Sequence, residues 1–232
     1  MEARYSVVVL AAGRGTRLGR PFPKPLTRLA NGHSIMQQQL SSLRALARPP
    51  VYIVVGFKKE LIMEDFPDEA FLYNPDFSET NTSKSLLRAL ERVPPGGVLW
   101  LNGDVVFDPH LLDELNSRLG GDETLVCVNH AAVGEEEVKY TVDSEGWVRE
   151  LSKTVTKPLG EAVGINYVAE RDRDMLVRHL ERCADDDYFE RAIETAIAEE
   201  SLRVRPVDIS QFACIELDVE DDLERANSLF GD

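Results

Sequence analysis

The sequence has few cysteines and no long apolar run. Its 232 residues include three cysteines, Cys127, Cys183 and Cys214, which lie far apart and form no Cys-x-x-Cys pair. Reduced, cytosolic thiols are therefore the simplest account. No apolar run approaches the length of a membrane-spanning helix, and the run after Arg4 is too short for a signal peptide. We therefore expect a soluble, cytoplasmic protein with no membrane partner.

Positive charge is also scarce. The chain has 26 Lys and Arg against 41 Asp and Glu, which gives a net charge of −15. Because such a surface repels a phosphate backbone, general binding to nucleic acid is excluded. A small anionic ligand remains compatible with this charge where Lys and Arg gather locally. The four histidines are scattered with no nucleophile–base spacing, so a histidine mechanism is not indicated.

The first apolar run and the loop after it form the most informative stretch. Residues 7–10 are Val-Val-Val-Leu, which predicts a strand buried on both faces. Gly13 and Gly15 follow, and glycines let backbone N–H groups approach a ligand closely. Arg17 and Lys24 add positive charge around this loop. Backbone donors and cations at the carboxyl end of a buried strand predict a phosphate-binding loop.

Two well-known phosphate loops do not fit this stretch. A P-loop needs Gly-Lys-Ser/Thr after its second glycine, which the chain lacks there. The dinucleotide fingerprint needs a third Gly or Ala where the chain has Leu18. It also needs an acidic residue about 20 positions further on, where residues 31–33 are Asn-Gly-His. Since a glycine-rich turn alone is often only a tight turn, the interpretation depends on other motifs.

The first half of the chain alternates strands with helices. The patterns predict strands at 51–56, 71–74, 98–102 and 125–129 and helices at 34–47, 58–64, 83–92 and 110–119. This alternation predicts an α/β fold with a mostly parallel sheet and helices on both faces. Ligands of such sheets bind beyond the carboxyl ends of the strands. Gly13 and Asp104 both lie at such ends.

The second half is richer in strands at first. The segments 138–142 and 147–151 flank a turn at 143–146, which predicts a hairpin in a β-rich lobe over the site. Further predicted elements are a strand at 161–168, helices at 173–183 and 187–199, strands at 202–207 and 212–219, and a helix at 221–229. No repeat or linker is evident. We therefore expect residues 1–232 to form one domain with a β-rich lid inserted at about 135–165.

Three carboxylates are candidates for a metal site. Asp104 ends an apolar strand, where a structural role would favour an uncharged residue. Glu216 and Asp218 are two apart in a predicted strand, so they point to the same side. Neighbouring carboxylates repel unless a cation neutralises them, and Mg²⁺ prefers carboxylate oxygens. The alternative is a solvated edge strand, because residues 220–222 are also acidic.

The loop motif resembles a known family. Residues 10–18, Leu-Ala-Ala-Gly-Arg-Gly-Thr-Arg-Leu, followed by Pro-Lys-Pro-Leu at 23–26, resemble the signature loop of the sugar-nucleotidyltransferase-like superfamily. The resemblance implies its fold, a Rossmann-like, mixed and mostly parallel sheet flanked by helices. In that family the loop wraps the triphosphate and the lysine contacts the phosphates. The implied ligand-binding residues are Ala11, Ala12, Gly13, Gly15 and Thr16, with Arg17 and Lys24 as catalytic residues.

Two further motifs correspond to the metal site of the family. Asn-Gly-Asp at 102–104 is similar to its Gly-Asp motif, and Glu-Leu-Asp at 216–218 resembles its Glu-Ile-Asp motif before a helix. The resemblance implies that Asp104 and Asp218 hold Mg²⁺, with Glu216 beside them.

Other segments resemble the small choline-phosphate and phosphonate cytidylyltransferases of this superfamily. Asn-Pro at 74–75 and Thr-Asn-Thr-Ser-Lys-Ser-Leu at 80–86 imply that Asn81 and Ser85 lie near the base and the acceptor. Residues 136–139, Glu-Glu-Val-Lys, resemble a Glu-Glu-Met-Lys segment, and 161–165 resemble part of a Gly-Glu-x-x-Gly-Ile stretch. Lys139, as a further catalytic residue, and Glu161 thereby join the predicted site, and Lys153, after the hairpin, is a candidate to reach the phosphates.

The acceptor end departs from the choline enzymes. Those relatives place aromatic residues after the Asn, which suit a quaternary ammonium, whereas this chain has Ser83 and Lys84. Lys84 at the acceptor would favour an anionic or polar group such as a carboxylated phosphonate; alternatively it faces solvent. Tyr188 and Glu190 are further candidates for the acceptor pocket.

The resemblance implies a Mg²⁺-dependent cytidylyltransferase. It would join CMP from CTP to a small phosphate or phosphonate acceptor and release pyrophosphate, as a monomer or a homodimer. No general base is needed, because the attacking oxygen is already an anion. The alternatives are a sugar-1-phosphate uridylyl- or thymidylyltransferase and a non-catalytic nucleotide-binding regulatory module. A GT-A glycosyltransferase would usually show Asp-x-Asp, but Asp104 is followed by two valines.

Overall fold

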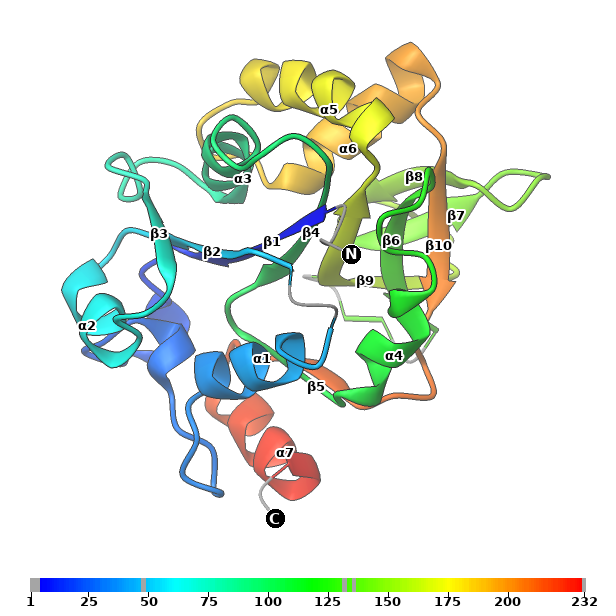
Figure 1. Cartoon of the computed structure of the whole chain (residues 1–232). Helices are drawn as coiled ribbons and strands as arrows, with labels where there is room; N and C mark the ends of the chain where they lie inside the picture. Colours follow the sequence, from blue (N-terminus) through cyan, green and yellow to red (C-terminus); the bar gives the residue numbers. More distant parts are fainter. Residues whose placement is uncertain (1–4, 47–48, 131–132, 135–136, 231–232) are drawn as a thin grey trace.

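The computed structural model describes residues 5–46, 49–130, 133–134 and 137–230 (Figure 1). A twisted sheet in the order β10-β6-β9-β4-β1-β2-β3 crosses the molecule. The strands along this path are β1 (Tyr5–Ala11), β2 (Val51–Val55), β3 (Ala70–Tyr73), β4 (Gly97–Asn102), β6 (Thr124–Asn129), β9 (Gly160–Val168) and β10 (Val204–Asp208), and a hairpin joins two further strands to the same sheet through β9. All neighbours pair in parallel except β9, which is antiparallel to β4 and β6. The predicted mixed, mostly parallel sheet is confirmed.

Helices cover both faces of this sheet. On one face lie α1 (Ile35–Leu43), α2 (Lys59–Asp65) and α4 (His110–Asn116), and on the other α3 (Thr82–Leu90), α5 (Glu170–Arg182) and α6 (Phe189–Glu200) (Figure 1). Consecutive residues of β1 alternate between the two cores. Val7 and Val9 pack with α1, whereas Val8 and Leu10 pack with α3. This explains why the strand is apolar at every position: each of its faces is covered.

The helix boundaries follow from local capping. Ser34 and Gln37 form a reciprocal capping box at the start of α1, and the Asn81 side chain accepts from the backbone N–H of Thr82 at the start of α3. The first helix ends earlier than predicted, at Leu43. Residues 44–46 continue in tighter turns, with i to i+3 hydrogen bonds to Ser42 and Leu43. Among the described helices, none is both long and apolar enough to cross a membrane.

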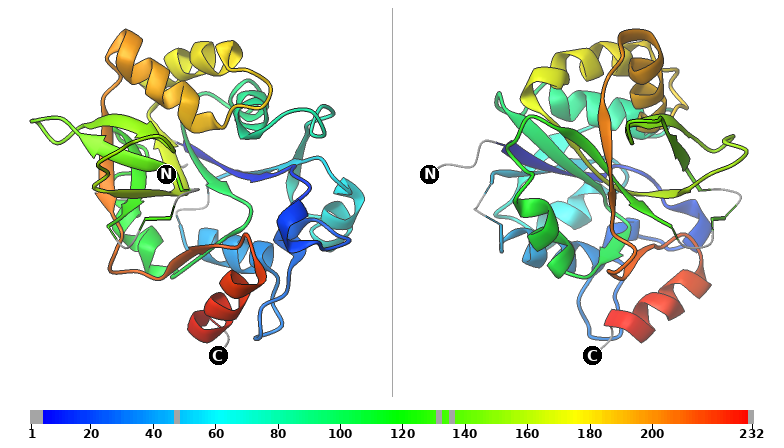
Figure 2. Two further views of the ribbon diagram at one scale, coloured as in Figure 1. Left: turned by 180° about the vertical axis from the view of Figure 1, so that it is seen from behind. Right: turned by 90° about the vertical axis from the view of Figure 1, so that its right-hand side faces the viewer.

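The predicted hairpin is present as β7 (Lys139–Val142) and β8 (Val148–Ser152). It lies on the side of the molecule away from β3, as Figure 1 and the left-hand view of Figure 2 show. The strand that follows, β9, is not part of the lid over the site. It pairs with β7 at its start and then runs between β4 and β6 in the middle of the main sheet. The β-rich segment is therefore continuous with the main sheet.

A small two-stranded ribbon, which the sequence patterns did not predict, lies at the edge of the site. β5 (Val105–Phe107) pairs antiparallel with β11 (Cys214–Glu216), and α7 (Glu220–Phe230) packs against it (Figure 2). The strand predicted at 212–219 is thus only three residues long. Beyond Glu216 the N–H of Leu217 still donates to the carbonyl oxygen of Asp104, and α7 begins at Glu220. The ribbon positions the carboxyl-terminal acidic segment beside the end of β4.

Candidate functional site

A cleft of about 290 Å³ opens at the carboxyl ends of β1 and β4. Six parts of the chain contribute to it: the glycine loop, the end of β4, the starts of α3 and α6, the β7–β8 hairpin with β9, and the segment after β11. Its lining residues are Leu10, Ala11, Gly13, Gly15, Arg17, Lys24, Pro25, Asn81, Thr82, Asn102, Gly103, Asp104, Glu137, Val138, Lys153, Ala162, Gly164, Tyr188, Phe189, Glu190, Glu216 and Asp218. The predicted strand-end position of the site is therefore correct.

Two glycines allow close backbone approaches at one end of this cleft. Gly15 has a φ of +57°, and a Cβ there would lie 2.8 Å from the Cβ of Lys24. A side chain at Gly103 would lie 2.8 Å from the carbonyl oxygen of Leu10, which accepts a hydrogen bond from the Gly103 N–H at 2.9 Å. The first glycine makes room for the lysine, and the second lets the turn before Asp104 lie against β1.

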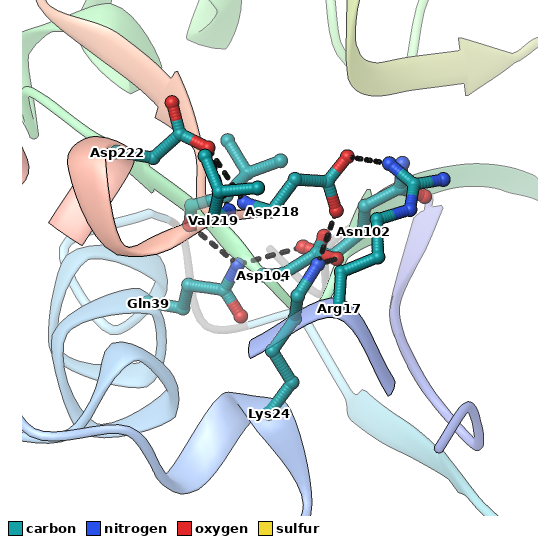
Figure 3. Close-up of polar contacts among 9 residues, drawn as sticks. Arg17, Lys24, Gln39, Asn102, Asp104, Asp218, Val219 and Asp222 are labelled. Carbon is teal, nitrogen blue, oxygen red and sulfur yellow. Dashed lines mark hydrogen bonds and ion pairs between the residues drawn. The ribbon is translucent and has the colours of Figure 1, made fainter. Parts of the chain in front are cut away.

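Lys24 is the centre of the polar network in Figure 3. Its side chain is only 8% exposed, and its Nζ donates to Asp104 Oδ2 at 2.7 Å and to Asp218 Oδ1 at 2.6 Å. Arg17 forms an ion pair with the other oxygen of Asp218. Burial alone would lower the pKa of Lys24, but the two carboxylates together raise it above its ordinary value. The lysine is therefore charged, and it neutralises the acidic pair.

Two residues that the sequence analysis did not identify support this network. Gln39, from the buried face of α1, donates to the carbonyl oxygens of Asn102 and Val105, both at 2.8 Å, and so holds both sides of the turn that contains Asp104. Asp222 accepts from the backbone N–H groups of Asp218 and Val219, each at 2.9 Å. Nothing in the sequence separates the first of these two residues from the glutamines that precede it.

Asp104, Glu216 and Asp218 each place a carboxylate oxygen within 4.8 Å of the others. Burial, and then the neighbouring Asp104 and Asp218, raises the pKa of Glu216 well above its ordinary value. Three hard oxygen donors this close together fit a divalent cation such as Mg²⁺, which takes carboxylate ligands. The carboxylates of Glu216 and Asp218 lie together as the sequence analysis predicted, although Asp218 itself lies two residues beyond the end of β11.

The glycine loop contributes only part of its predicted residues to the cleft. Ala11, Gly13 and Gly15 line it. Ala12 lies outside the lining; it is buried, and its carbonyl oxygen accepts from the N–H of Phe57 at 3.0 Å. Thr16 begins the short 3₁₀ helix Thr16–Leu18, which carries Arg17.

The opposite end of the cleft is formed by the starts of α3 and α6. Asn81 lines it, and its side chain donates to the carbonyl oxygen of Asp186 at 3.2 Å. Tyr188 and Glu190 also line it, as the sequence analysis suggested. The ammonium group of Lys153 lies 4.7 Å from the centre of the Tyr188 ring.

Two residues assigned to the acceptor by resemblance lie elsewhere. The Nζ of Lys84 donates to the carbonyl oxygens of Leu180, at 3.2 Å, and Cys183, at 2.5 Å, where α5 ends. Its side chain is therefore bonded to the backbone outside the lining of the cleft rather than simply facing solvent, and contact with an acceptor stays a prediction. Ser85 is buried and accepts from the side-chain amide of Asn74 at 3.2 Å. The Ser85 hydroxyl thus fixes the position of the Asn74 side chain.

The remaining predicted residues lie at the hairpin. Lys139 and Glu161 face each other in the register of β7 and β9, outside the cleft lining. The Lys139 ammonium donates to the carbonyl oxygen of Lys153 at 3.1 Å. Burial and then the nearby Glu137 raise the pKa of Glu161 to about 7. Of the Glu-Glu-Val-Lys segment, Glu136 lies outside the described residues.

Comparison with known families agrees with this geometry. The model of the MobA-like NTP transferase domain matches residues 7–196, which include the glycine loop, Lys24 and the turn at Asp104. The chain belongs to the MobA-like NTP transferase family. The match ends before the segment that carries Glu216 and Asp218, so these two carboxylates are placed by the structure.

Curated relatives of this MobA-like chain match part of their own length. It is 30% identical to the CMP-5′-(3-aminopropyl)phosphonate synthase of Streptomyces rubellomurinus, over 96% of this chain and 38% of that protein. It is 32% identical to the bifunctional protein GlmU of Gloeobacter violaceus, over 65% of this chain and 34% of that protein. The chain thus spans about a third of the length of these relatives.

Solved structures show the same fold. The CTP:phosphocholine cytidylyltransferase LicC of Streptococcus pneumoniae superposes with a TM-score of 0.79 at 18% identity, over 97% of this chain and 99% of that one. The inositol-1-phosphate CTP transferase of T. maritima also gives 0.79, at 19% identity, over 99% of this chain and 95% of that one. The MobA-like fold therefore extends along nearly the whole chain, including the segment beyond residue 196.

Proposed function

We propose that this protein is a Mg²⁺-dependent cytidylyltransferase that joins CMP from CTP to a small phosphate or phosphonate acceptor. The observation that carries the proposal is the meeting of Lys24, Asp104 and Asp218 at hydrogen-bond distance beside the glycine loop. Support for CTP comes from the CMP-5′-(3-aminopropyl)phosphonate synthase and from the two CTP-using enzymes that share the fold.

In the proposed reaction an oxygen of the acceptor attacks the α-phosphorus of CTP, the bond to the β-phosphate breaks, and pyrophosphate leaves. The backbone at Gly13 and Gly15 binds the triphosphate, and Lys24 with Arg17 neutralises charge on it. The attacking oxygen is already an anion near neutral pH, so no general base is required. Catalysis by this chain then consists of positioning and charge neutralisation.

The carboxylates of Asp104 and Asp218, with Glu216 beside them, are the residues that would hold Mg²⁺. When bound, the cation would stabilise negative charge on the phosphates. Asp104 and Asp218 are already held in position by backbone contacts: the N–H of Leu217 donates to the Asp104 carbonyl oxygen at 3.0 Å, which ties the two segments together.

The decisive assay measures pyrophosphate with CTP, UTP, dTTP, ATP and GTP against a pool of phosphorylated and phosphonate acceptors. We expect release with CTP, with products identified by mass spectrometry. Lys24→Ala should lower kcat at least about 100-fold, since a charge-stabilising contact contributes that much. Exposed Lys157→Ala is the matched control and should keep full activity.

Different results would point to the alternatives. Turnover of sugar 1-phosphates with UTP or dTTP would replace the proposal with a sugar nucleotidyltransferase. Binding of CTP without pyrophosphate release, with any acceptor, would make the protein a nucleotide-binding module. Full activity of Lys24→Ala would contradict the proposed role of the network in Figure 3.

A further inference from the structure

Glu190 is the most unusual residue of the cleft that the proposed chemistry does not use. It lines the cleft from the first turn of α6 and is only 8% exposed. Its Oε2 is buried without a hydrogen-bond partner among the described residues. A buried carboxylate oxygen without a donor is unfavourable by the desolvation energy of the group, so such a residue is expected to meet a partner in the working state.

The protein itself supplies little compensating charge. Burial raises the pKa of Glu190 to about 7, and its own backbone N–H and then the neighbouring Lys153 lower it only in part. The other lining cations, Arg17 and Lys24, bind Asp218 and Asp104 at the opposite end. The Oε2 atom of Glu190 therefore lacks a hydrogen-bond donor and a full counter-charge, and a ligand that carries a cation would supply both.

The cleft is poorly suited to a quaternary ammonium. Such a group cannot donate a hydrogen bond and is bound by the faces of several aromatic rings. The described lining has two aromatic residues. Phe189 is 1% exposed, with its ring edge-on to Trp100, and Tyr188 already lies against the ammonium of Lys153. A primary ammonium has three N–H donors and would satisfy the oxygen that a trimethylammonium would leave without one.

The cleft is equally unsuited to a carboxyl-bearing acceptor. The cation that favoured such an acceptor, Lys84, is bound to the carbonyl groups at the end of α5. A second carboxylate placed beside Glu190 would be repelled by it.

We propose that Glu190 binds a primary ammonium group of the acceptor, so that the acceptor is an aminoalkyl phosphate or phosphonate. This inference rests on the proposed function and adds the specificity-determining residue to it. The reacting phosphonate lies toward Lys24 and the carboxylate cluster, and the ammonium lies toward α6.

Four acceptors of similar length test the proposal: 2-aminoethylphosphonate, its N,N,N-trimethyl derivative, propylphosphonate and 2-carboxyethylphosphonate. Because a hydrogen-bonded charge pair is worth about 10- to 100-fold, we expect kcat/KM with CTP to be greater by about that factor for the amine than for uncharged propylphosphonate. The trimethyl and carboxyl compounds should be no better than propylphosphonate.

The variant Glu190→Gln should lower the ratio of kcat/KM between the amine and propylphosphonate to within about threefold of one, while the KM for CTP changes little. Glu190→Asp keeps the charge and should keep part of the ratio. Glu194→Gln, one turn further along α6 and paired with Arg191, is the matched control and should keep all of it. Melting temperatures confirm that each variant is folded.

The outcomes separate the two proposals. Turnover with CTP but no preference for the amine, or a preference that survives in Glu190→Gln, overturns the role of Glu190 and leaves the cytidylyltransferase intact. If no acceptor is turned over with any triphosphate, the proposed function fails. Calorimetric titration of the same four compounds then decides on Glu190: equal affinity for the amine and propylphosphonate overturns its role.

Discussion

At the scale of single residues, the cleft holds charged side chains where burial opposes charge. Lys24 is 7% exposed and resolves this by contact with Asp104 and Asp218. Glu190 is 8% exposed and has no such contact at Oε2. The fold therefore stabilises the charged form of Lys24 and destabilises the charged form of Glu190.

Glu190→Gln should consequently stabilise the ligand-free protein above neutral pH. The pKa of Glu190 rises from 4.5 to about 7 on folding, so its neutral form is favoured in the native state. The wild type has this contribution to its free energy of unfolding in full below about pH 4.5. As the pH rises through about 7 it loses the contribution, up to about 3 kcal/mol, because the native state must then carry the buried charge. Glutamine is always neutral and avoids this loss.

The measurement is the free energy of unfolding in urea at pH 4.5, 6 and 8. We expect the difference between Glu190→Gln and wild type to grow from pH 4.5 to 7 and then level off. Glu161, whose pKa also rises to about 7, is present in both proteins and cancels. A constant difference across this range, or a loss of stability at pH 8, would contradict the burial argument. Glu194→Gln serves again as control.

The candidate functional residues within the motifs could be predicted from the sequence, but the residues outside the motifs that contact and position them could not. The loop motif identified Lys24, and the strand-end position identified Asp104. Nothing local distinguishes Gln39 from its neighbours Gln37 and Gln38, although only Gln39 reaches the turn of Asp104. Its role depends on how α1 packs on the sheet.

At the scale of elements, the starts of α3 and α6 lie side by side and are hydrogen-bonded to each other. The N–H of Asn81 donates to the carbonyl oxygen of Asp185 at 2.7 Å, and the N–H of Phe189 donates to the hydroxyl of Thr82 at 3.2 Å. The end of α5 is fixed beside them by Lys84. The acceptor end of the cleft is thus built by three helices whose termini are bound to one another.

Replacing Lys84 by Met should therefore affect stability rather than the acceptor. The variant keeps the aliphatic stem but leaves the carbonyl groups at the end of α5 without their donor, so we expect a loss of about 1–2 kcal/mol. Urea unfolding measures the loss, and the KM for the acceptor should stay within about twofold. Lys59→Met, on α2, is the control with little effect. A tenfold rise in that KM, at unchanged stability, would restore Lys84 to the acceptor site.

The elements with strong local signals could be predicted, and those made by long-range pairing could not. Continuous apolar runs placed the buried strands β1 and β4, and two segments flanking a turn placed the hairpin β7–β8, each within one or two residues. The ribbon of β5 and β11 has three residues a strand, and its partners are more than 100 positions apart. Strands this short carry no period, and their pairing depends on the rest of the fold being in place.

At the scale of the whole molecule, the site joins parts of the chain that are remote in sequence. Lys24 is 80 positions from Asp104 and 194 from Asp218. The strand-end argument predicted that the glycine loop and Asp104 lie at one edge of the sheet. That Asp218 joins them was implied only by the resemblance of the motifs. Neither could predict the position of Lys24, which without a metal lies between the carboxylates that would hold one. A divalent cation bound by these carboxylates, as proposed, would therefore compete with the lysine for the same negative charge.

This competition leads to a stability experiment. Lys24→Met leaves Asp104, Glu216 and Asp218 within 4.8 Å of one another with their main counter-charge removed, so it should lower the melting temperature. A loss of about 1–3 kcal/mol corresponds to roughly 3–10 °C in a chain of this size. Adding 10 mM MgCl₂ should restore much of this loss, because the cation replaces the ammonium, whereas the wild type should respond less.

Two further samples decide whether the carboxylates are responsible. Lys24→Met combined with Asp104→Asn removes one of the repelling charges together with one ligand. It should melt at a higher temperature than Lys24→Met in EDTA and respond less to MgCl₂. Lys157→Met reports any general effect of the salt on a surface lysine variant. If Lys24→Met responds to MgCl₂ no more than the wild type does, Asp104 and Asp218 do not form a cation site. The opposite result would show that the fold uses one charge, from lysine or from metal, to keep three distant segments together.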